Sequence, residues 1–389
     1  MSKEKICFLI INLGKGGAET VLTALANSLV SKYEVHICVF DDLLKQDIDS
    51  RCKIHQLVQF KIPSYLRLLL VPLLALRLYR YLKKNNIVNI ISFLERANYT
   101  NCFLKYLSSK FNHIVTINTA LSKWYKKGTL SGATGRFLVK KLYPKADQVI
   151  CCSNYARYEM KEIFNVDSGK IHTVYNGIDT EKIDVLKLEG NNLTDNAYSF
   201  IHVGSFYEGK NHMLLIEGFK KFLLSGRKAK LILIGRGYMK NKIVSIINED
   251  ETLIKNVIVP ENTENQYAYM HKADCLVLTS DFEGLPTVIM EAFACGLNVI
   301  STDCISGPRE LLTDPVNITT HLTDENEIGK YGILFPVNNP ELLFKSLCEI
   351  FDDKDLAYRQ KMNIEKIKAT FDIKIMAEKY ESYLRFKKS

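Results

Sequence analysis

Short apolar runs alternate with longer amphipathic stretches through most of the chain. The runs are rich in Val, Ile, Leu and Phe and predict buried strands, whereas the stretches between them predict helices with one buried face. In the first half we expect strands at Ile6–Asn12, Glu34–Phe40, Ile87–Phe93, His113–Asn118 and Gln148–Cys152, and helices at Glu19–Ser31, Tyr65–Lys84, Asn98–Ser109 and Arg136–Tyr143. This alternation is typical of parallel sheets joined by right-handed crossovers.

The same alternation begins again after a polar interval at Leu186–Asn196. Here we expect strands at Ser199–Val203, Lys230–Ile234, Asn256–Val259, Cys275–Thr279 and Asn298–Ser301, and helices at Met213–Leu224, Asn241–Asn248, Glu264–Lys272 and Thr287–Ala294. Two series predict two doubly wound α/β domains, residues 1–178 and 179–371, and we expect the helical segment 372–389 to pack back on the first. Such domains bind ligands at the carboxyl ends of their strands and in the cleft between domains.

Composition agrees with a folded two-domain protein, since 47% of the 389 residues are hydrophobic and 24% are charged. The strongest apolar run, Leu68–Leu76, is far short of the about 20 residues that span a bilayer. No C-x-x-C spacing occurs among the ten cysteines, which indicates reduced thiols in a cytosol. The D-x-D strings at 47–49 and 353–355 lie in polar surface stretches, so we expect no metal and no cofactor.

Charge is distributed unevenly between the two halves. Residues 1–178 hold 26 Lys and Arg against 12 Asp and Glu, whereas residues 179–389 hold 26 against 31. Basic residues lie among leucines and aromatics in Lys61–Lys84 and in Lys123–Lys127, which contains the only tryptophan. This composition fits a surface that binds anionic lipid, although ordinary crossover helices with one charged face remain an alternative.

The segment Thr279–Gly296 holds the most informative chemistry. A predicted strand ends, a turn containing glycine follows, and Pro286 stands where the first helical residue is expected. The backbone around Gly284, Leu285, Pro286 and Thr287 would face the ligand with the positive end of the helix dipole, which favours an anion. Glu283 and Glu291 on either side suit the hydroxyl groups of sugars. A capped helix with two solvated glutamates is the alternative from the residues alone.

Glu283 and Glu291, in the context E-G-L-P-x4-E-A-x-A-x-G, resemble the E-x7-E motif of retaining GT-B glycosyltransferases of the family-four group. Val174–Asp179 resembles the family's interdomain V-x-N-G-I/V-D signature, and Gly204–Asn211 resembles its diphosphate-binding turn. With Gly14–Glu19 after the first strand, the resemblance covers roughly residues 1–370. It implies a GT-B fold, in which two Rossmann-like domains face each other across a cleft.

The resemblance also implies a role for each matching residue. Lys210 would neutralise the donor diphosphate, Glu283 would hold the hydroxyls of the transferred sugar, and Glu291 would hold the ribose. Lys210 and Glu283 form the implied catalytic pair. The implied donor-binding residues are Gly16, Gly17, Lys210, Arg236, Glu261, Glu283, Gly284, Leu285, Pro286, Thr287 and Glu291.

Three positions depart from the family pattern. Ser205 replaces the arginine that usually partners the lysine, so either Arg236 supplies that charge or phosphate binding is weaker. Pro260 replaces a glycine beside the base, and no histidine occupies the loop after Ile117. On the acceptor side the sequence offers Glu95, Arg96, Asn118 and Thr119 instead, while His113 is expected to point elsewhere.

The resemblance implies a retaining, metal-independent hexosyl- or N-acetylhexosaminyltransferase. We expect a nucleotide-sugar donor with UDP as carrier, and a polyprenyl-diphosphate-linked saccharide acceptor in capsule, O-antigen or other surface polysaccharide synthesis. The protein would be cytoplasmic and bound peripherally to the anionic inner face of the plasma membrane. A catalytically inactive nucleotide-sugar-binding partner of such an enzyme is the main alternative. An epimerase shares the architecture but not the E-x7-E context. Nucleic-acid binding would not account for the Asn176–Asp179 and Glu283–Glu291 motifs.

Overall fold

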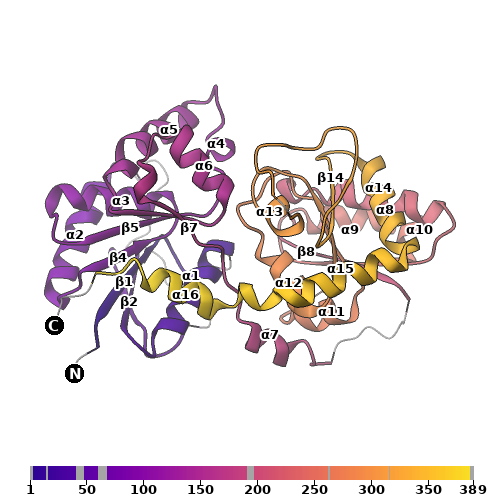
Figure 1. Cartoon of the computed structure of the whole chain (residues 1–389), viewed down its shortest axis with the longest axis horizontal. Coiled ribbons are helices and arrows are strands. Elements are labelled where there is room, and N and C mark those ends of the chain that lie inside the picture. Colours follow the sequence, from indigo (N-terminus) through magenta and orange to yellow (C-terminus); the bar gives the residue numbers. More distant parts are fainter. Residues whose placement is uncertain are drawn as a thin grey trace. The chain divides into compact units, whose positions relative to one another are not determined.

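The computed structural model describes residues 3–14, 16–40, 48–59, 68–190, 197–261, 263–314 and 316–385. The chain forms two compact units (Figure 1). Unit 1 comprises Met1–Ile178 and Asp372–Ser389, and unit 2 comprises Asp179–Phe371. Parts of the expectations above lie outside the described residues, namely Lys15, Asp47 and the ranges 61–67, 191–196 and 386–389.

Unit 1 is built on a seven-stranded sheet with the order β3-β2-β1-β4-β5-β6-β7. Every neighbouring pair in this sheet is parallel. The strands are β1 (Lys5–Ile10), β2 (Glu34–Val39), β3 (Lys53–Gln56), β4 (Asn89–Ser92), β5 (Asn112–Ile117), β6 (Gln148–Cys151) and β7 (Ile171–Thr173). Because all run in one direction, their carboxyl ends share one edge of the sheet.

Helices cover both faces of this sheet, as a parallel sheet requires. Along β1, Ile6, Phe8 and Ile10 pack in one core with α1, while Cys7 and Leu9 pack in another with α2. Both cores exclude water from the strand, which explains its continuous apolar run. The helices of unit 1 are α1 (Gly17–Leu29), α2 (Val71–Asn85), α3 (Glu95–Leu107), α4 (Leu121–Trp124), α5 (Leu130–Leu142), α6 (Asn154–Glu162) and α16 (Ile373–Glu381).

The end of the chain belongs to unit 1. Helix α16 packs beside α1 and contributes Met376 and Tyr380 to the same core (Figure 1). After the helix, Asn89 Nδ2 donates to the Arg385 carbonyl and Asn89 Oδ1 accepts from the Arg385 amide, each at 2.8 Å. Asn112 Nδ2 donates to the Tyr383 carbonyl at 2.9 Å. These buried amides therefore bind the terminal backbone as a neighbouring strand would.

Unit 2 repeats the architecture with the order β10-β9-β8-β11-β12-β14-β13. Only the β13–β14 pair is antiparallel. The strands are β8 (Ser199–Val203), β9 (Lys230–Ile234), β10 (Val257–Ile258), β11 (Cys275–Leu278), β12 (Asn298–Thr302), β13 (Glu327–Ile328) and β14 (Ile333–Phe335). The helices are α7 (Thr180–Leu186), α8 (His212–Leu224), α9 (Lys240–Asn248), α10 (Glu251–Ile254), α11 (Gln266–Lys272), α12 (Thr287–Cys295), α13 (Pro308–Leu312), α14 (Pro340–Asp352) and α15 (Lys354–Ile367).

Every predicted strand has a counterpart in the structure, but several other elements were not predicted. These are the strands β3, β7, β13 and β14 and the helices α4, α6, α7, α10 and α13–α15, and α5 begins at Leu130 instead of Arg136. The described cysteines are all free thiols, as expected. Among the described residues, no helix combines the length and apolar character that crossing a membrane requires.

Candidate active site

Four adjacent parallel strands of unit 2 are followed by loops that carry four of the predicted donor-binding residues at one edge of the sheet. In the order β10-β9-β8-β11, the loops after the strands carry Glu261, Arg236, Lys210 and Glu283 respectively. Residues far apart in sequence therefore lie on loops along one edge, because their strands end together. This is the edge at which doubly wound sheets bind ligands.

The turn that carries Lys210 is held from two sides. Thr279 Oγ1, at the end of β11, donates to the Lys210 carbonyl at 2.9 Å, and the Asp281 amide donates to the Gly209 carbonyl at 3.0 Å. Asn211 adopts a left-handed conformation, with φ 50°, and its side chain caps α8. These two hydrogen bonds join the loops and hold the Lys210 backbone beside the loop of Glu283.

Lys210 and Glu283 form an ion pair in this structure. Lys210 Nζ donates to Glu283 Oε1 at 2.5 Å, with side chains 28% and 12% exposed. The catalytic pair implied by the sequence is therefore in direct contact. A ligand phosphate that binds Lys210 has to compete with this carboxylate, and a carboxylate released from the lysine becomes free to accept hydrogen bonds from hydroxyl groups.

The N-terminus of α12 is open toward the same edge. Pro286 is the N-cap of α12 and not its first residue, and no side chain caps the helix. The loop before α12 is held by a hydrogen bond in which Ser306 Oγ donates to the Gly284 carbonyl at 2.7 Å. A Cβ at Gly307, which has φ 83°, would approach that carbonyl to 2.6 Å. The first N–H groups of α12 are therefore available for an anion.

Glu291 lies one helical turn inside α12 and is almost entirely buried, with 7% of its surface exposed. Gln266 Nε2 on α11 donates to Glu291 Oε2 at 2.7 Å. Burial raises the pKa of Glu291 to about 7, and the bond from Gln266 opposes that shift. Sequence reasoning missed Gln266 because it precedes Glu291 by 25 residues on another helix and no motif links the two.

Arg236 lies beside the position where the family arginine is missing. The Phe206 amide donates to the Arg236 carbonyl, and the Gly204 amide donates to the Ile234 carbonyl, both at 2.9 Å. These two bonds flank Ser205. A Cβ at Gly235 would come within 1.9 Å of the Gly204 carbonyl, so only glycine permits this approach.

The backbone of Arg236 therefore lies next to Ser205, and the Arg236 side chain is exposed. The loop after β10 is tied down as well, because Lys240 Nζ donates to the carbonyls of Pro260 and Glu261 at 2.9 and 3.1 Å. The side chain of Glu261 remains exposed.

Two buried histidines lie behind the Lys210 turn. His202 and His212 contact each other edge to face, and His212 stacks on Phe206. Burial lowers the pKa of His202 to about 4 and that of His212 to about 2. Both rings are therefore neutral at physiological pH and add no positive charge to the site.

The remaining predicted residues lie at the carboxyl edge of unit 1, after the adjacent strands β1, β4 and β5. Gly16 is the N-cap of α1 and Gly17 its first residue, and no side chain caps this helix. Glu95 and Arg96 begin α3 directly after Leu94, which has φ 71°. Burial raises the pKa of Glu95.

Side chains after β5 complete this edge. Asn118 Nδ2 donates to Thr116 Oγ1 at 3.0 Å, and Thr119 is half-buried. His113 lies at the other end of the strand, with Nδ1 3.0 Å from Asn101 Oδ1. The prediction that His113 points away from this site is therefore confirmed.

The described residues contain no group of three or more His, Cys, Asp or Glu side chains that could hold a metal ion. Of the two D-x-D strings, Asp49 pairs with Arg51 and Asp353 caps α15. Asp355 lies in the first turn of the same helix α15.

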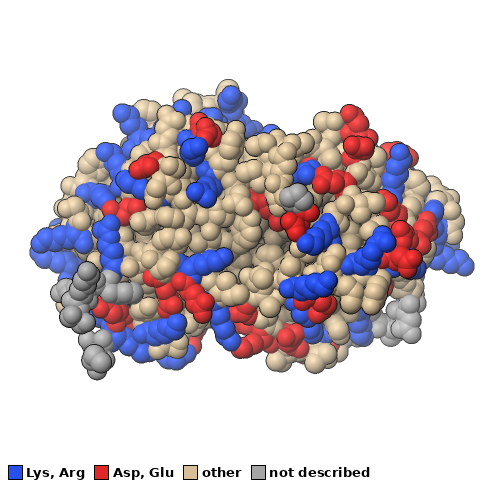
Figure 2. Space-filling model, in the orientation of Figure 1, with Lys and Arg blue, Asp and Glu red and all other residues tan. Residues whose placement is uncertain are grey.

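Exposed apolar and basic side chains occur together on α4 and α5. Trp124, Leu130 and Phe137 are exposed, Leu130 by 86%. Lys126, Lys127, Lys140 and Lys141 are exposed in the same segment. Figure 2 shows Lys and Arg side chains across unit 1, with Asp and Glu side chains among them, and both signs of charge on unit 2 as well.

Comparison with known proteins identifies the family of both units. Residues 15–182 match Glycosyltransferase Family 4, and residues 187–367 match Glycosyl transferases group 1. The chain is 32% identical over 363 residues to the N-acetylgalactosamine-N,N'-diacetylbacillosaminyl-diphospho-undecaprenol 4-alpha-N-acetylgalactosaminyltransferase of Campylobacter jejuni, covering 92% of this chain and 93% of that protein. A second C. jejuni alpha-1,4-N-acetyl-D-galactosaminyltransferase is 25% identical and covers 80% of this chain and 82% of that protein.

Solved structures show the same fold. Anabaena HepE in complex with UDP superposes with a TM-score of 0.77 at 18% identity, covering 97% of this chain and 98% of that one. A sucrose-phosphate synthase from Thermosynechococcus elongatus gives a TM-score of 0.77 at 17% identity, covering 98% of each chain. The chain therefore belongs to the family-four type of glycosyltransferases and has the GT-B fold.

Proposed function

We propose that this glycosyltransferase retains anomeric configuration and moves a hexose or N-acetylhexosamine from a UDP-sugar to a saccharide carried on polyprenyl diphosphate. The observation that carries the proposal is the Lys210–Glu283 pair beside the uncapped N-terminus of α12. It joins a cation and helix amides for a diphosphate with a carboxylate for sugar hydroxyls. On this proposal unit 2 binds the donor and unit 1 the acceptor.

In this reaction the protein has to stabilise the charge that develops on the leaving phosphate and to orient the sugar. The bond between the sugar C1 and the β-phosphate oxygen breaks, and the acceptor oxygen bonds to C1 on the same face. The departing phosphate oxygen accepts the acceptor's proton. Lys210 and the amides of α12 stabilise the negative charge that grows on this phosphate, while Glu283 orients the sugar.

We further propose that this charge is supplied by the protein and not by a metal. Lys210 and the dipole of α12 act on the phosphates, and Arg236 adds a second positive side chain next to Ser205. Arginine binds phosphate oxygens in a bidentate manner, which suits it to replace the family's usual residue.

The identity of the donor and acceptor rests on the relatives. The Anabaena neighbour holds UDP, and both C. jejuni relatives are named N-acetylgalactosaminyltransferases that act on undecaprenol-linked substrates. These names favour an N-acetylhexosamine and a lipid-linked acceptor for this chain, in the synthesis of a capsule, O-antigen or related surface polysaccharide. Glu95, Arg96, Asn118 and Thr119 are the residues that we propose contact the acceptor.

We propose that the protein associates peripherally with the cytoplasmic face of the membrane. The exposed Trp124, Leu130 and Phe137 would enter the headgroup region, and the neighbouring lysines would attract anionic lipid. This placement brings the enzyme to an acceptor whose lipid end is in the bilayer.

The alternative is a donor-binding partner without catalysis, which Ser205 favours because it removes one phosphate-binding charge. Glu283→Ala decides between the two. Loss of transfer with an unchanged unfolding transition supports the enzyme, provided that Glu217→Ala, an exposed glutamate on α8, leaves transfer intact. Equal activity of wild type and Glu283→Ala would overturn the proposed role of this pair.

A further inference from the structure

Exposed aromatic side chains gather at the edge of unit 2 that carries Lys210. Among the described residues of unit 2, four aromatic side chains are exposed, namely Tyr207, Tyr238, Phe282 and Tyr358. The first three lie in the loops after β8, β9 and β11, which are neighbours in the sheet, and the fourth lies on α15. Large apolar side chains that cluster on a surface mark a place where a ligand or partner binds.

Tyr207 and Tyr238 contact each other. Their ring centroids are 5.3 Å apart and their planes are tilted by 48°. Tyr207 is 50% exposed and Tyr238 is 68% exposed. Neither hydroxyl forms a hydrogen bond with another described residue. The tyrosine pair therefore presents two ring surfaces to solvent, with two hydroxyl groups that can each donate and accept a hydrogen bond.

Backbone hydrogen bonds join the two loops that carry the tyrosine pair. The Phe206 amide donates to the Arg236 carbonyl at 2.9 Å, and the Met239 amide donates to the Phe206 carbonyl at 3.1 Å. Phe206 and Met239, each the neighbour of one tyrosine, pack in the core of unit 2. The exposed rings therefore lie on a backbone that is already ordered, which lowers the entropy cost of binding a ligand there.

The tyrosine pair lies on one side of Lys210 and the loop of Glu283 lies on the other. In the sheet β8 lies between β9 and β11. Tyr238 follows β9, Glu283 follows β11, and Lys210 shares the turn after β8 with Tyr207. The Lys210 amide donates to the Tyr207 carbonyl at 3.1 Å, which closes this turn. A phosphate on Lys210 would therefore have the sugar-binding carboxylate on one side and the tyrosine pair on the other.

The proposed reaction places the acceptor against the same phosphate. The acceptor hydroxyl gives its proton to the departing phosphate oxygen, so the sugar that carries this hydroxyl has to touch that phosphate. The transferred sugar occupies the side of Glu283. The side of Tyr207 and Tyr238 remains for the acceptor, and ring surfaces with free hydroxyls match the C–H faces and hydroxyl groups of a saccharide.

The nucleobase of the donor is a poorer match for the tyrosine pair. Glu291, which is implied to hold the ribose, lies on α12 and binds Gln266 on α11. The tyrosines instead precede α8 and α9, which pack in a core that contains no residue of α11 or α12. The two pairs of helices therefore cover different faces of the sheet, and a base attached to that ribose starts from the face opposite the tyrosines.

We propose that Tyr207 and Tyr238 form a subsite for the acceptor saccharide, in which the rings stack on its sugar. The proposal rests on the proposed function and extends it, because the acceptor contacts named above all lie in unit 1. On this proposal unit 2 binds part of the acceptor as well as the donor. The free hydroxyls bond to hydroxyl groups of the same sugar.

The test compares three variants of the full chain. Tyr207→Ala with Tyr238→Ala removes both rings, Tyr207→Phe with Tyr238→Phe keeps them, and Tyr358→Ala removes a ring that is 64% exposed on α15. Initial rates with a polyprenyl-diphosphate-linked saccharide give KM and kcat, and calorimetry gives the UDP affinity. We expect the alanine pair to raise the acceptor KM about tenfold, with kcat within about threefold and UDP affinity within about twofold. The phenylalanine pair and Tyr358→Ala should stay within about threefold of wild type throughout.

A binding assay that needs no turnover completes the test. Saturation-transfer NMR with methyl N-acetyl-α-galactosaminide and UDP-bound protein should show transfer to the sugar's C–H protons in wild type and Tyr358→Ala. The alanine pair should lose this transfer. If wild type binds the sugar through the tyrosine pair but moves no sugar, the glycosyltransferase proposal fails and the subsite stands.

Three results would overturn the subsite. Weaker UDP binding by the alanine pair with an unchanged acceptor KM would place the nucleobase on the rings. An unchanged KM together with unchanged saturation transfer would show that the tyrosine pair binds no saccharide. Equal losses in the phenylalanine and alanine pairs would exclude stacking as the source of binding.

Discussion

Replacing Glu283 with Gln is expected to strengthen UDP binding while it removes sugar transfer. In the free protein Lys210 Nζ is 2.5 Å from Glu283 Oε1, so the diphosphate has to take the lysine from the carboxylate. UDP carries no transferred sugar, so it has no hydroxyl groups of that sugar to donate hydrogen bonds to Glu283. Glutamine keeps the shape of the side chain but removes its charge, and UDP then binds without that competition.

The structure sets the size of the effect. Exposed ion pairs contribute 0.2 to 1 kcal/mol, and this pair is near the upper limit because its side chains are only 28% and 12% exposed. Removing about 1 kcal/mol of this competing ion pair corresponds to about fivefold tighter UDP binding. Lys210→Met should instead weaken UDP by about tenfold or more, since it removes a charge-assisted bond.

Isothermal titration of UDP into wild type and the two variants measures both effects, and UDP release from the donor measures transfer. We expect Glu283→Gln to lower transfer by about 100-fold or more, because the carboxylate acts on the reacting sugar. UDP binding to Glu283→Gln that is no tighter than to wild type would refute the competition for Lys210. Unchanged UDP affinity in Lys210→Met would refute its role at the diphosphate.

Two further predictions concern stability and the membrane. Burial raises the pKa of Glu291 from 4.5 to about 7, so between these values the folded protein keeps a proton that the unfolded chain has lost. The free energy of unfolding should therefore fall as pH rises across this window, by up to about 3 kcal/mol. Glu291→Gln should abolish this fall, which urea unfolding at several pH values measures, and an unchanged slope would contradict the assignment. Replacing the four exposed lysines of the α4–α5 segment with Glu should release the protein from anionic vesicles in a sedimentation assay; these are Lys126, Lys127, Lys140 and Lys141. Undiminished binding would exclude that surface.

The long buried strands could be predicted from sequence because burial on both faces leaves a continuous apolar run. In β1 every residue from Ile6 to Ile10 is buried, and the run is unmistakable. The edge strand β3 is different, since Lys53 and Ile54 are exposed and His55 is half-buried. Its place in the sheet comes from pairing with β2 and not from its own pattern.

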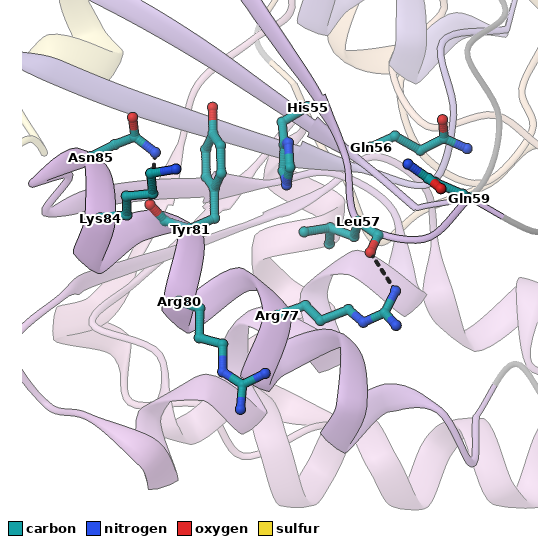
Figure 3. A pocket seen from close by; sticks show the side chains of 9 residues that line it. All are labelled: His55, Gln56, Leu57, Gln59, Arg77, Arg80, Tyr81, Lys84 and Asn85. Carbon is teal, nitrogen blue, oxygen red and sulfur yellow. Dashed lines mark hydrogen bonds between the residues drawn. The ribbon is translucent and has the colours of Figure 1, made fainter.

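The donor half-site could be predicted where local spacing encodes it. Glu283 and Glu291 are joined by one turn and one helix, so their separation in sequence fixes their placement. Contacts that depend on strand order, such as that of Gln266 with Glu291, could not be predicted from the sequence. The same holds for the pocket between the end of β3 and helix α2 (Figure 3), because β3 was not predicted and the strand beside this helix was therefore unknown.

A donor screen tests the central claim most directly. Purified protein is incubated with each common UDP- and GDP-sugar in EDTA, with and without a polyprenyl-diphosphate-linked saccharide, and nucleotide release is measured. The account predicts release of UDP from one UDP-sugar that depends on the lipid-linked saccharide and persists in EDTA. Tight UDP binding without release from any donor would contradict it and identify the protein as a donor-binding partner without catalysis.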